Sequence, residues 1–335
     1  MKNNYDKKFS IAHYDASEDD NLFLECFENS SEQYRNEIYD IYFGTVFLHR
    51  DVTYGETMGV TASPAQYKNL LKIQEKYGIP ISLTLNEMNR PMEMLRGNVI
   101  KEFVSFIKKY YDDGVRSCTI SHTHLMRTGA LQEAFPDMNW KNTVNHRITT
   151  TQEFLDYAQL GYNIIQLDRN YNRNLNELKR TKKEADRLGV KTCLLIKEGC
   201  MPECPFKTEH DCWQGGSIRY EGKSYWDIVP FTCNTWRGTH AVKEVHNPRA
   251  GTDIMIHSKE DWDDFAEKVD VFKLSGRLQS CSGPAAKFGY YLEMWKDPEK
   301  QDQAPWPNTH MFEVSSFKDV YENNLTPFHM WFRSL

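Results

Sequence analysis

Residues 150–196 read TTQEFLDYAQLGYNIIQLDRNYNRNLNELKRTKKEADRLGVKTCLLI, and this stretch decides the fold class. Thr150 and Glu153 have the spacing of a capping box, which predicts a helix that ends at the next glycine. The apolar run Ile164–Asp168 follows as a predicted strand. A second amphipathic helix, which also ends at a glycine, leads to a predicted strand over Thr192–Ile196. Alternating helices and strands of this kind are typical of βα units around a parallel sheet.

The same unit of apolar run, loop and amphipathic stretch repeats from residue 38 to about residue 200. Ser63 and Pro64 mark the start of one helix, and another is predicted over Asn98–Asp112. Six or seven units favour a TIM-like (β/α) barrel over a doubly wound sheet, and no glycine-rich phosphate loop is present. The predicted strands are Ile41–Thr45, Ile81–Leu85, Arg116–Ser121, Lys141–Asn145, Ile164–Asp168, Thr192–Ile196 and Val271–Ser275.

The organisation that we predict has three parts. An N-terminal segment (residues 1–37) precedes the α/β barrel (38–299), which carries a metal-binding insertion (199–260), and a C-terminal tail (300–335) follows. The tail is rich in aromatic residues, which pack on the outer helices of a barrel more often than they form a lid or a dimer interface. We therefore expect the tail to pack on the barrel.

The composition is that of a folded globular protein. Hydrophobic residues make up 40% and charged residues 26% of the 335 residues, which excludes extensive disorder. The net charge of −6 disfavours a general polyanion binder. The sequence has no apolar run long enough to span a membrane and no apolar core of a secretory signal near its start. We therefore predict a cytoplasmic protein without membrane insertion.

Four of the eight cysteines crowd together, with the spacing Cys200-x3-Cys204-x7-Cys212-x20-Cys233. In a reducing cytoplasm such a group binds metal more often than it forms disulfides. Four thiolates hold either a tetrahedral zinc ion or a 4Fe–4S cluster, and the proline after Cys204 favours the cluster. His210 is an alternative metal ligand, in place of one of the four thiolates. Because Cys200 follows the sixth predicted strand, we expect the site at the carboxyl-terminal mouth of the barrel, where barrel enzymes keep their active sites.

The residues that follow the other predicted strands supply further candidates, since the carboxyl ends of barrel strands converge on one cavity. Carboxylates and histidines suit general acid–base chemistry, and arginine binds an anionic group through two hydrogen bonds. Taken singly, each such residue is more often part of a salt bridge or a loop cap. The candidates for catalysis are Glu87, His122 and Asp168, and those for substrate binding are Asn86, Asn145, Arg169, Lys273 and Arg277.

A pair of histidines suggests an alternative metal site. His122 and His124 are expected on the same side of an extended strand, where Glu87 is the nearest candidate carboxylate. We favour the cysteines as ligands, because they already account for a metal.

Three motifs are informative together. They are Glu198-Gly199-Cys200-x3-Cys204-Pro205-Phe206, Asp270-Val271-Phe272-Lys273-Leu274-Ser275-Gly276-Arg277 and, more weakly, Gln166-Leu167-Asp168-Arg169. With these motifs, the chain resembles the collagenase-like peptidase family U thirty-two (U32) over roughly residues 38–297. The cysteine motif and the Lys-x-x-Gly-Arg motif are fairly specific as a pair.

The resemblance implies a TIM-like barrel and, as in several family members, a four-iron cluster on four cysteines. For this chain, the resemblance implies that the cluster ligands are Cys200, Cys204, Cys212 and Cys233. Better understood relatives support oxygen-independent hydroxylation of ubiquinone precursors or of RNA bases. The spacing between the first two cysteines is tighter here than in some relatives, so the substrate is not carried over.

We therefore expect an iron–sulfur-dependent redox enzyme that performs oxygen-independent hydroxylation, or related chemistry, on a small molecule or RNA with an electron-transfer partner. The alternative is a zinc-stabilised barrel that acts as a peptidase, another hydrolase or a non-catalytic binding scaffold. A basic run from Arg169 to Lys191 suits RNA phosphates or, more simply, a solvated helix face. A homo-oligomer is left open.

Overall fold

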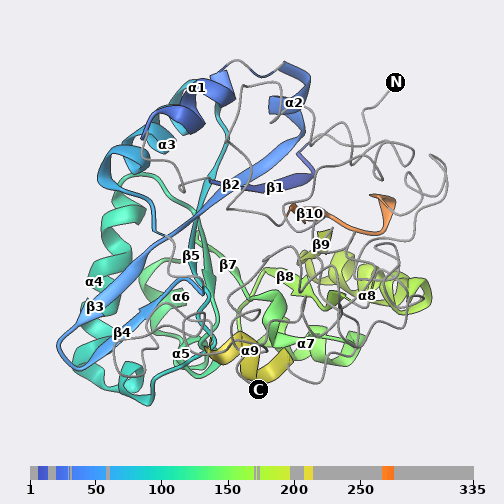
Figure 1. Ribbon diagram of the computed structural model, residues 1–335. Helices are drawn as coiled ribbons and strands as arrows, with labels where there is room; N and C mark the ends of the chain where they lie inside the picture. Colours follow the sequence, from blue (N-terminus) through green and yellow to red (C-terminus); the bar gives the residue numbers. More distant parts are fainter. Residues whose placement is uncertain are drawn as a thin grey trace, which may run out of the picture.

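The chain folds into a closed barrel of parallel strands with helices packed around it (Figure 1). The computed structural model describes residues 7–13, 20–28, 30, 32–57, 61–169, 171, 174–196, 207–213 and 266–274. The strand order in the barrel is β1-β10-β9-β8-β7-β6-β5-β2, and the sheet closes because β1 pairs with both β2 and β10. The predicted TIM-like (β/α) barrel is confirmed.

The elements alternate along the chain as βα units require. The barrel strands are β1 (Phe9–Ala12), β2 (Ile38–Gly44), β5 (Ile81–Leu85), β6 (Ser117–Ile120), β7 (Asn139–Lys141), β8 (Ile164–Leu167), β9 (Lys191–Ile196) and β10 (Val271–Leu274). An antiparallel hairpin, β3 (Val46–His49) and β4 (Val52–Gly55), follows β2. The helices are α1 (Leu22–Glu28), α2 (Glu32–Glu37), α3 (Pro64–Tyr77), α4 (Gly97–Asp112), α5 (Thr123–Arg127), α6 (Ala130–Ala134), α7 (Thr151–Gln159), α8 (Leu175–Leu188) and α9 (Lys207–Trp213), with short 3-10 turns η1 (Met92–Leu95) and η2 (Val144–His146).

The helices begin and end where local side-chain chemistry requires it. Ser63 Oγ accepts the backbone N–H of Gln66 at 3.1 Å, and the Gln66 side chain accepts that of Ser63 at 2.7 Å, which completes a capping box at α3. Thr150 and Glu153 form the same arrangement at α7, at 3.2 and 3.1 Å. α3 ends at Gly78, whose φ of 65° lies in the left-handed region that favours glycine. The helix ends predicted from these residues are confirmed.

The main core lies between the strands and the surrounding helices. On α4, the fully buried side chains of Val99, Phe103 and Ile107 recur every four residues and form one face. Phe103 packs edge-on against Phe47 of β3, with 5.1 Å between the ring centroids. Burying each such side chain stabilises the fold by about 1.5–3 kcal/mol.

Two predicted boundaries are wrong. Phe9–Ala12 is a barrel strand, so the barrel begins inside the predicted N-terminal segment 1–37. The strand predicted over Lys141–Asn145 is instead Asn139–Lys141, because the Thr143 side chain accepts the backbone N–H of Asn145 and starts η2. The barrel therefore has one strand more than the sequence pattern predicted.

The insertion predicted at residues 199–260 contributes one described helix, α9, to this structure. The rest of the insertion and the tail at 300–335 lie outside the described residues, so their predicted roles are untested. Among the helices of the described part, none has the length and apolar character needed to span a membrane.

Candidate active site at the barrel mouth

The carboxyl ends of the parallel strands meet at one end of the barrel, the lower end in Figure 1. The helix α5, which directly follows β6, lies there, and α9 is drawn toward the same end of the molecule. Arg90, in the loop after β5, is within electrostatic reach of both Cys212 on α9 and His146 on η2. We conclude that α9 lies at this mouth.

Asn86 and Glu87 follow β5; Glu87 binds the end of the β3–β4 hairpin, and Asn86 binds the chain just after it. Asn86 Oδ1 accepts the backbone N–H of Thr57 at 2.9 Å, and Glu87 Oε2 accepts that of Gly55 at 3.2 Å. Both side chains are buried. They therefore help to hold the hairpin against the mouth, and their roles in substrate binding and catalysis stay predictions.

Tyr54 on β4 joins the ends of two barrel strands, and no sequence pattern pointed to it. Its hydroxyl donates to the backbone oxygen of Leu85 at 2.8 Å and accepts the backbone N–H groups of Ser121 and His122 at 3.0 and 3.1 Å. Complete burial raises the pKa of the Tyr54 phenol far above its ordinary value, so the hydroxyl keeps its proton. The contact depends on the long-range docking of the hairpin, which sequence periodicity does not encode.

His122 caps α5. Its Nδ1 accepts the backbone N–H of Leu125 at 3.2 Å, which assigns the proton to Nε2, 3.1 Å from the backbone oxygen of Pro91. Burial lowers the pKa of His122. The expectation that His122 and His124 share one side of an extended strand is wrong, because the chain enters a helix at Thr123. The catalytic role of His122 stays a prediction.

Asn145 and Arg169 meet at the mouth, from η2 and from the end of β8. Arg169 Nη2 donates to Asn145 Oδ1 at 3.2 Å, and both side chains are buried. Asp168, next to Arg169 in sequence, is also buried, and its backbone N–H donates to the oxygen of Ile148 at 2.8 Å. The structure thus brings together two residues predicted to bind substrate and places a predicted acid–base residue beside them.

His146 lies at the mouth, on η2 next to Asn145. Its Nε2 lies 2.8 Å from the backbone oxygen of Ser121, and its ring lies 5.1 Å from that of Tyr157. Burial lowers the pKa of His146 to about 4, so the imidazole is neutral at pH 7. The feature of the sequence that indicated His146 was its position directly after a predicted strand.

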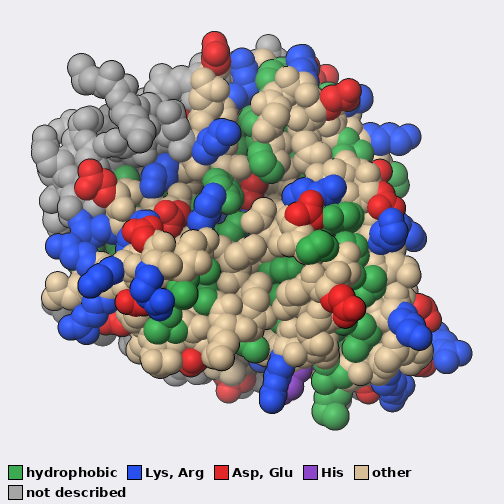
Figure 2. Space-filling model, turned by 180° about the vertical axis from the view of Figure 1, so that it is seen from behind, with side chains coloured by type: hydrophobic (Ala, Val, Ile, Leu, Met, Phe, Trp, Pro, Cys, Tyr) green, Lys and Arg blue, Asp and Glu red, His purple; other side chains and the backbone are tan. Residues whose placement is uncertain are grey.

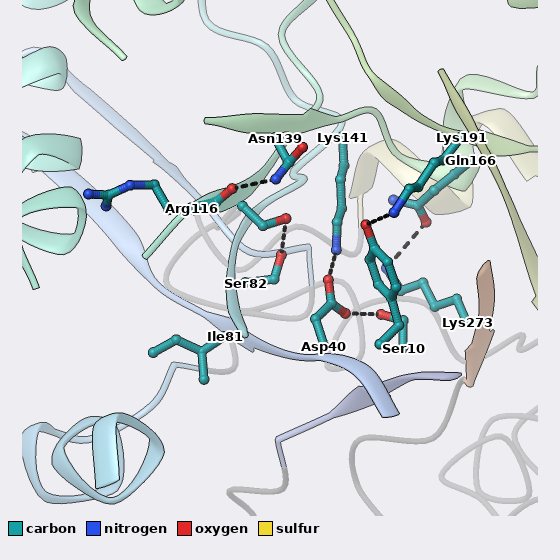
Figure 3. A network of polar contacts seen from close by, with 12 residues as sticks. Ser10, Asp40, Ile81, Ser82, Arg116, Asn139, Lys141, Gln166, Lys191 and Lys273 are labelled. Carbon is teal, nitrogen blue, oxygen red and sulfur yellow. Dashed lines mark hydrogen bonds and ion pairs between the residues drawn. The ribbon is translucent and has the colours of Figure 1, made fainter. Parts of the chain in front are cut away.

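The lumen below the mouth contains a buried ion pair (Figure 3). Lys141 Nζ of β7 contacts Asp40 Oδ2 of β2, and Ser10 Oγ of β1 donates to Asp40 Oδ1 at 2.5 Å. The Lys141 and Asp40 side chains are 5% and 1% exposed. Because β2 and β7 are not neighbours in the sheet, this pair spans the lumen.

A second lumen contact involves Lys273, a predicted substrate-binding residue. Its Nζ lies 3.3 Å from Gln166 Oε1, a contact drawn as a dashed line in Figure 3. The same Nζ lies 4.4 Å from the centroid of the Tyr42 ring. Lys273 is 8% exposed. The lumen therefore holds two lysines and an aspartate, where barrels usually have bulky apolar residues.

The predicted metal ligands are described only in part. Cys212 is half-buried on α9, burial raises the pKa of its thiol, and Arg90 acts in the opposite direction. A buried ion pair between Lys207 and Asp211 lies on the same helix. In the described part of the chain, no three His, Cys, Asp or Glu side chains are grouped as a metal site. The predicted site residues outside the described part are Cys200, Cys204, Cys233 and Arg277.

The basic run after β8 forms the exposed face of α8. Figure 2 shows Lys and Arg side chains on the side where α8 lies, with acidic side chains between them. Such pairing is typical of a solvated helix face. The pairs on α8 include Arg180 with Glu177 at 3.4 Å and Arg187 with Glu184 at 2.7 Å.

Comparisons with known proteins identify the fold. No protein-family model matches the chain, and no curated protein matches its sequence. The solved structure of the U32 peptidase Mk0906 is similar to it with a TM-score of 0.52 and 12% sequence identity, over 82% of this chain and 95% of that one. An enolase from Bradyrhizobium, complexed with magnesium and mandelic acid, has a TM-score of 0.35 and 10% identity over 62% of this chain and 49% of that one, which is too slight to carry an argument. The resemblance to the U32 peptidases, predicted from three motifs, is confirmed at the level of the fold.

Proposed function

We propose that this chain is an iron–sulfur-dependent redox enzyme whose reaction takes place at the carboxyl-terminal mouth of the barrel. The observation that supports this most is the position of Cys212, on a helix at that mouth and within electrostatic reach of Arg90. The fold shared with a U32 peptidase agrees with it. The reaction that we infer is oxygen-independent hydroxylation of a small molecule or of an RNA base.

The donor set fits a soft metal centre. Thiolates are the preferred ligands of iron–sulfur clusters and also bind zinc. Cys212 would hold the cluster together with Cys200, Cys204 and Cys233. Burial raises the pKa of the Cys212 thiol, and the positive charge of Arg90 opposes part of this rise. A bound 4Fe–4S cluster supplies electron transfer beside the substrate.

The side chains of the mouth and lumen would bind the substrate and move protons. Arg169, oriented by Asn145, presents its guanidinium to an anionic group. Lys273 offers a second cation from the lumen. Asp168 and Glu87 are the carboxylates that would take up and return a proton.

The chemistry balances with one co-substrate. Hydroxylation replaces a C–H bond of the substrate with a C–O bond and removes two electrons from that carbon. An oxygen-atom donor other than O2 supplies the oxygen and accepts those two electrons. The proton lost from the C–H bond passes to a mouth carboxylate and returns to the new hydroxyl, and an electron-transfer partner keeps the cluster in its working state.

Anaerobic purification of the full chain tests the proposal. We expect a brown protein with iron and sulfide in stoichiometric amounts, whose visible absorption bleaches with dithionite. Cys212→Ser should lose most of the iron, because a hydroxyl is a poor ligand for iron. Cys118→Ser is the matched control, since this fully buried thiol lies in β6, and it should keep the iron.

Arg169→Ala and Arg277→Ala separate substrate binding from metal binding. Each should keep the wild-type iron content and lose activity, because their expected task is to hold the substrate. A colourless protein with one zinc ion per chain would overturn the redox proposal. It would favour the alternative, a zinc-stabilised hydrolase, which the name of the similar U32 peptidase also suggests.

A further inference from the structure

We propose that Asn142 is a positioning residue, which joins the carboxyl ends of β7 and β8 and thereby holds the guanidinium of Arg169 against Asn145 at the mouth. The inference rests on the proposed function, which gives Arg169 the task of binding an anionic group of the substrate. The backbone ladder between the two strands is short and consists of one residue pair, Lys141 with Ile164. Nearer the mouth, the side chain of Asn142 continues the connection.

The side-chain amide of Asn142 bonds Gln166 of β8 as the backbone of a neighbouring strand would. Its Oδ1 accepts the backbone N–H of Gln166 at 2.5 Å. Its Nδ2 donates to the backbone oxygen of Gln166 at 3.1 Å and to that of Thr143 at 3.3 Å. Gln166 Nε2 returns a bond to the backbone oxygen of Asn142. Asn142 and Gln166 are both buried, so water does not compete for these bonds.

A tight turn carries Asn145 from this connection to the mouth. Thr143 Oγ1 accepts the backbone N–H of Asn145 at 3.4 Å, and the backbone oxygen of Thr143 accepts that of His146 at 3.0 Å, which forms η2. Asn145 Oδ1 in turn accepts a hydrogen bond from Arg169 Nη2 at 3.2 Å. The amide of Asn142 and the contact at Arg169 are therefore linked by a short, internally bonded stretch of chain.

Two segments of equal length are thus tied together at both ends. Asn145 lies three residues after Asn142, and Arg169 lies three residues after Gln166. Without the bonds of Asn142, the ends of β7 and β8 are free to separate, and Asn145 moves away from the guanidinium. A displacement of about 1 Å is enough to break a hydrogen bond of 3.2 Å.

Hydrogen exchange of the Arg169 guanidinium tests the proposal by NMR. The full chain is labelled with 15N-arginine, and Arg169→Lys identifies the signal of Arg169 by its loss. In wild type we expect Nη protons that exchange slowly with water, because the guanidinium is buried and bonded. Asn142→Leu keeps the size of the side chain, removes its hydrogen bonds and should speed this exchange about tenfold, as should Asn145→Leu. Asn142→Asp keeps the acceptor and loses the donor, so it should speed the exchange by about threefold.

The double variant of Asn142→Leu with Asn145→Leu separates positioning from a general loss of stability. Because Asn142 acts through Asn145, the double variant should exchange no faster than Asn145→Leu alone, whereas a general loosening would multiply the two effects. The matched control is Asn139→Leu, at the other end of β7, whose Nδ2 donates to the backbone oxygen of Arg116 at 3.0 Å. It should leave the exchange of Arg169 unchanged.

Unchanged exchange in both Asn142→Leu and Asn142→Asp, or effects that multiply in the double variant, would overturn the inference. Unchanged exchange would assign the contact to the backbone bond that Asp168 donates to Ile148 at 2.8 Å. Iron content of the same preparations reports on the proposed function, and Asn142→Leu should retain the iron of the wild type. A wild-type protein without iron but with slow exchange at Arg169 would contradict the proposed function alone, so the two failures are distinguishable.

Discussion

Breaking the ion pair between Lys141 and Asp40 should destabilise the protein strongly. Lys141→Met removes the ammonium and keeps a side chain of comparable length. Since the two side chains are 5% and 1% exposed, the carboxylate of Asp40 is left in the lumen without the charge that compensates it. Removing one partner of a buried pair typically costs about 3–5 kcal/mol. The hydrogen bond that Ser10 donates at 2.5 Å offsets part of this, so we expect a loss of about 3 kcal/mol.

The double variant separates the ion pair from simple packing. Replacing both partners, with Lys141→Met and Asp40→Leu, removes the buried charges together, which is often neutral or stabilising in proteins. We expect its free energy of unfolding to lie within about 1 kcal/mol of wild type. The double variant should therefore be more stable than Lys141→Met alone.

Urea denaturation of the full chain measures these free energies of unfolding. The matched control is Lys108→Met on α4, which breaks an exposed pair with Asp112 whose side chains are 61% and 56% exposed. Such a pair contributes at most about 0.5 kcal/mol. The reasoning fails if Lys141→Met costs less than about 1 kcal/mol, or if the double variant loses as much as the sum of the two single variants.

Three further changes have definite expected outcomes. Tyr54→Phe removes the acceptor of two buried amides, those of Ser121 and His122, and should lower the free energy of unfolding by about 2–3 kcal/mol in urea. For His146, the folded pKa of about 4 lies below the ordinary histidine value of 6.5, so the unfolded chain binds the proton first and stability falls as the pH drops from about 6.5 to about 4. His146→Phe should flatten the dependence of stability on pH in that window, and an unchanged slope would refute the assignment. Thr150→Ala removes the N-cap of α7 and should cost about 1 kcal/mol, measured as a lower midpoint of urea denaturation.

The sequence predicted those parts of the fold that depend on local chemistry. Capping boxes and glycine stops lie within a few residues, so α3 and α7 begin where their sequences predicted. β1 escaped prediction because it is four residues long and buried throughout, which gives it no alternating pattern, and two helices separate it from β2. Its strand character comes from pairing with β10, more than 250 residues later.

The sequence predicted where the candidate site lies better than it predicted which side chains contact one another there. The carboxyl ends of the strands converge in every parallel barrel, so Asn145 and Arg169 were expected to lie near each other. Their side chains do form a hydrogen bond. The contact of Tyr54 with the end of β5 needed the docked hairpin. The ion pair of Lys141 with Asp40 joins residues 101 positions apart, and no local pattern marks it.

The division between the two layers of the barrel suggests why its lumen is polar. The large cluster of buried apolar side chains lies between the strands and the helices. A second, separate apolar cluster is much smaller and consists of Ile164, Cys193 and Val271. The outer core therefore supplies most of the hydrophobic free energy, and it offsets the cost of burying Asp40 and Lys141 in the lumen. A sequence selected for stability alone would fill that space with branched apolar side chains. This lumen instead keeps polar side chains directly below the mouth. A cavity that binds a ligand needs such polar groups to orient it.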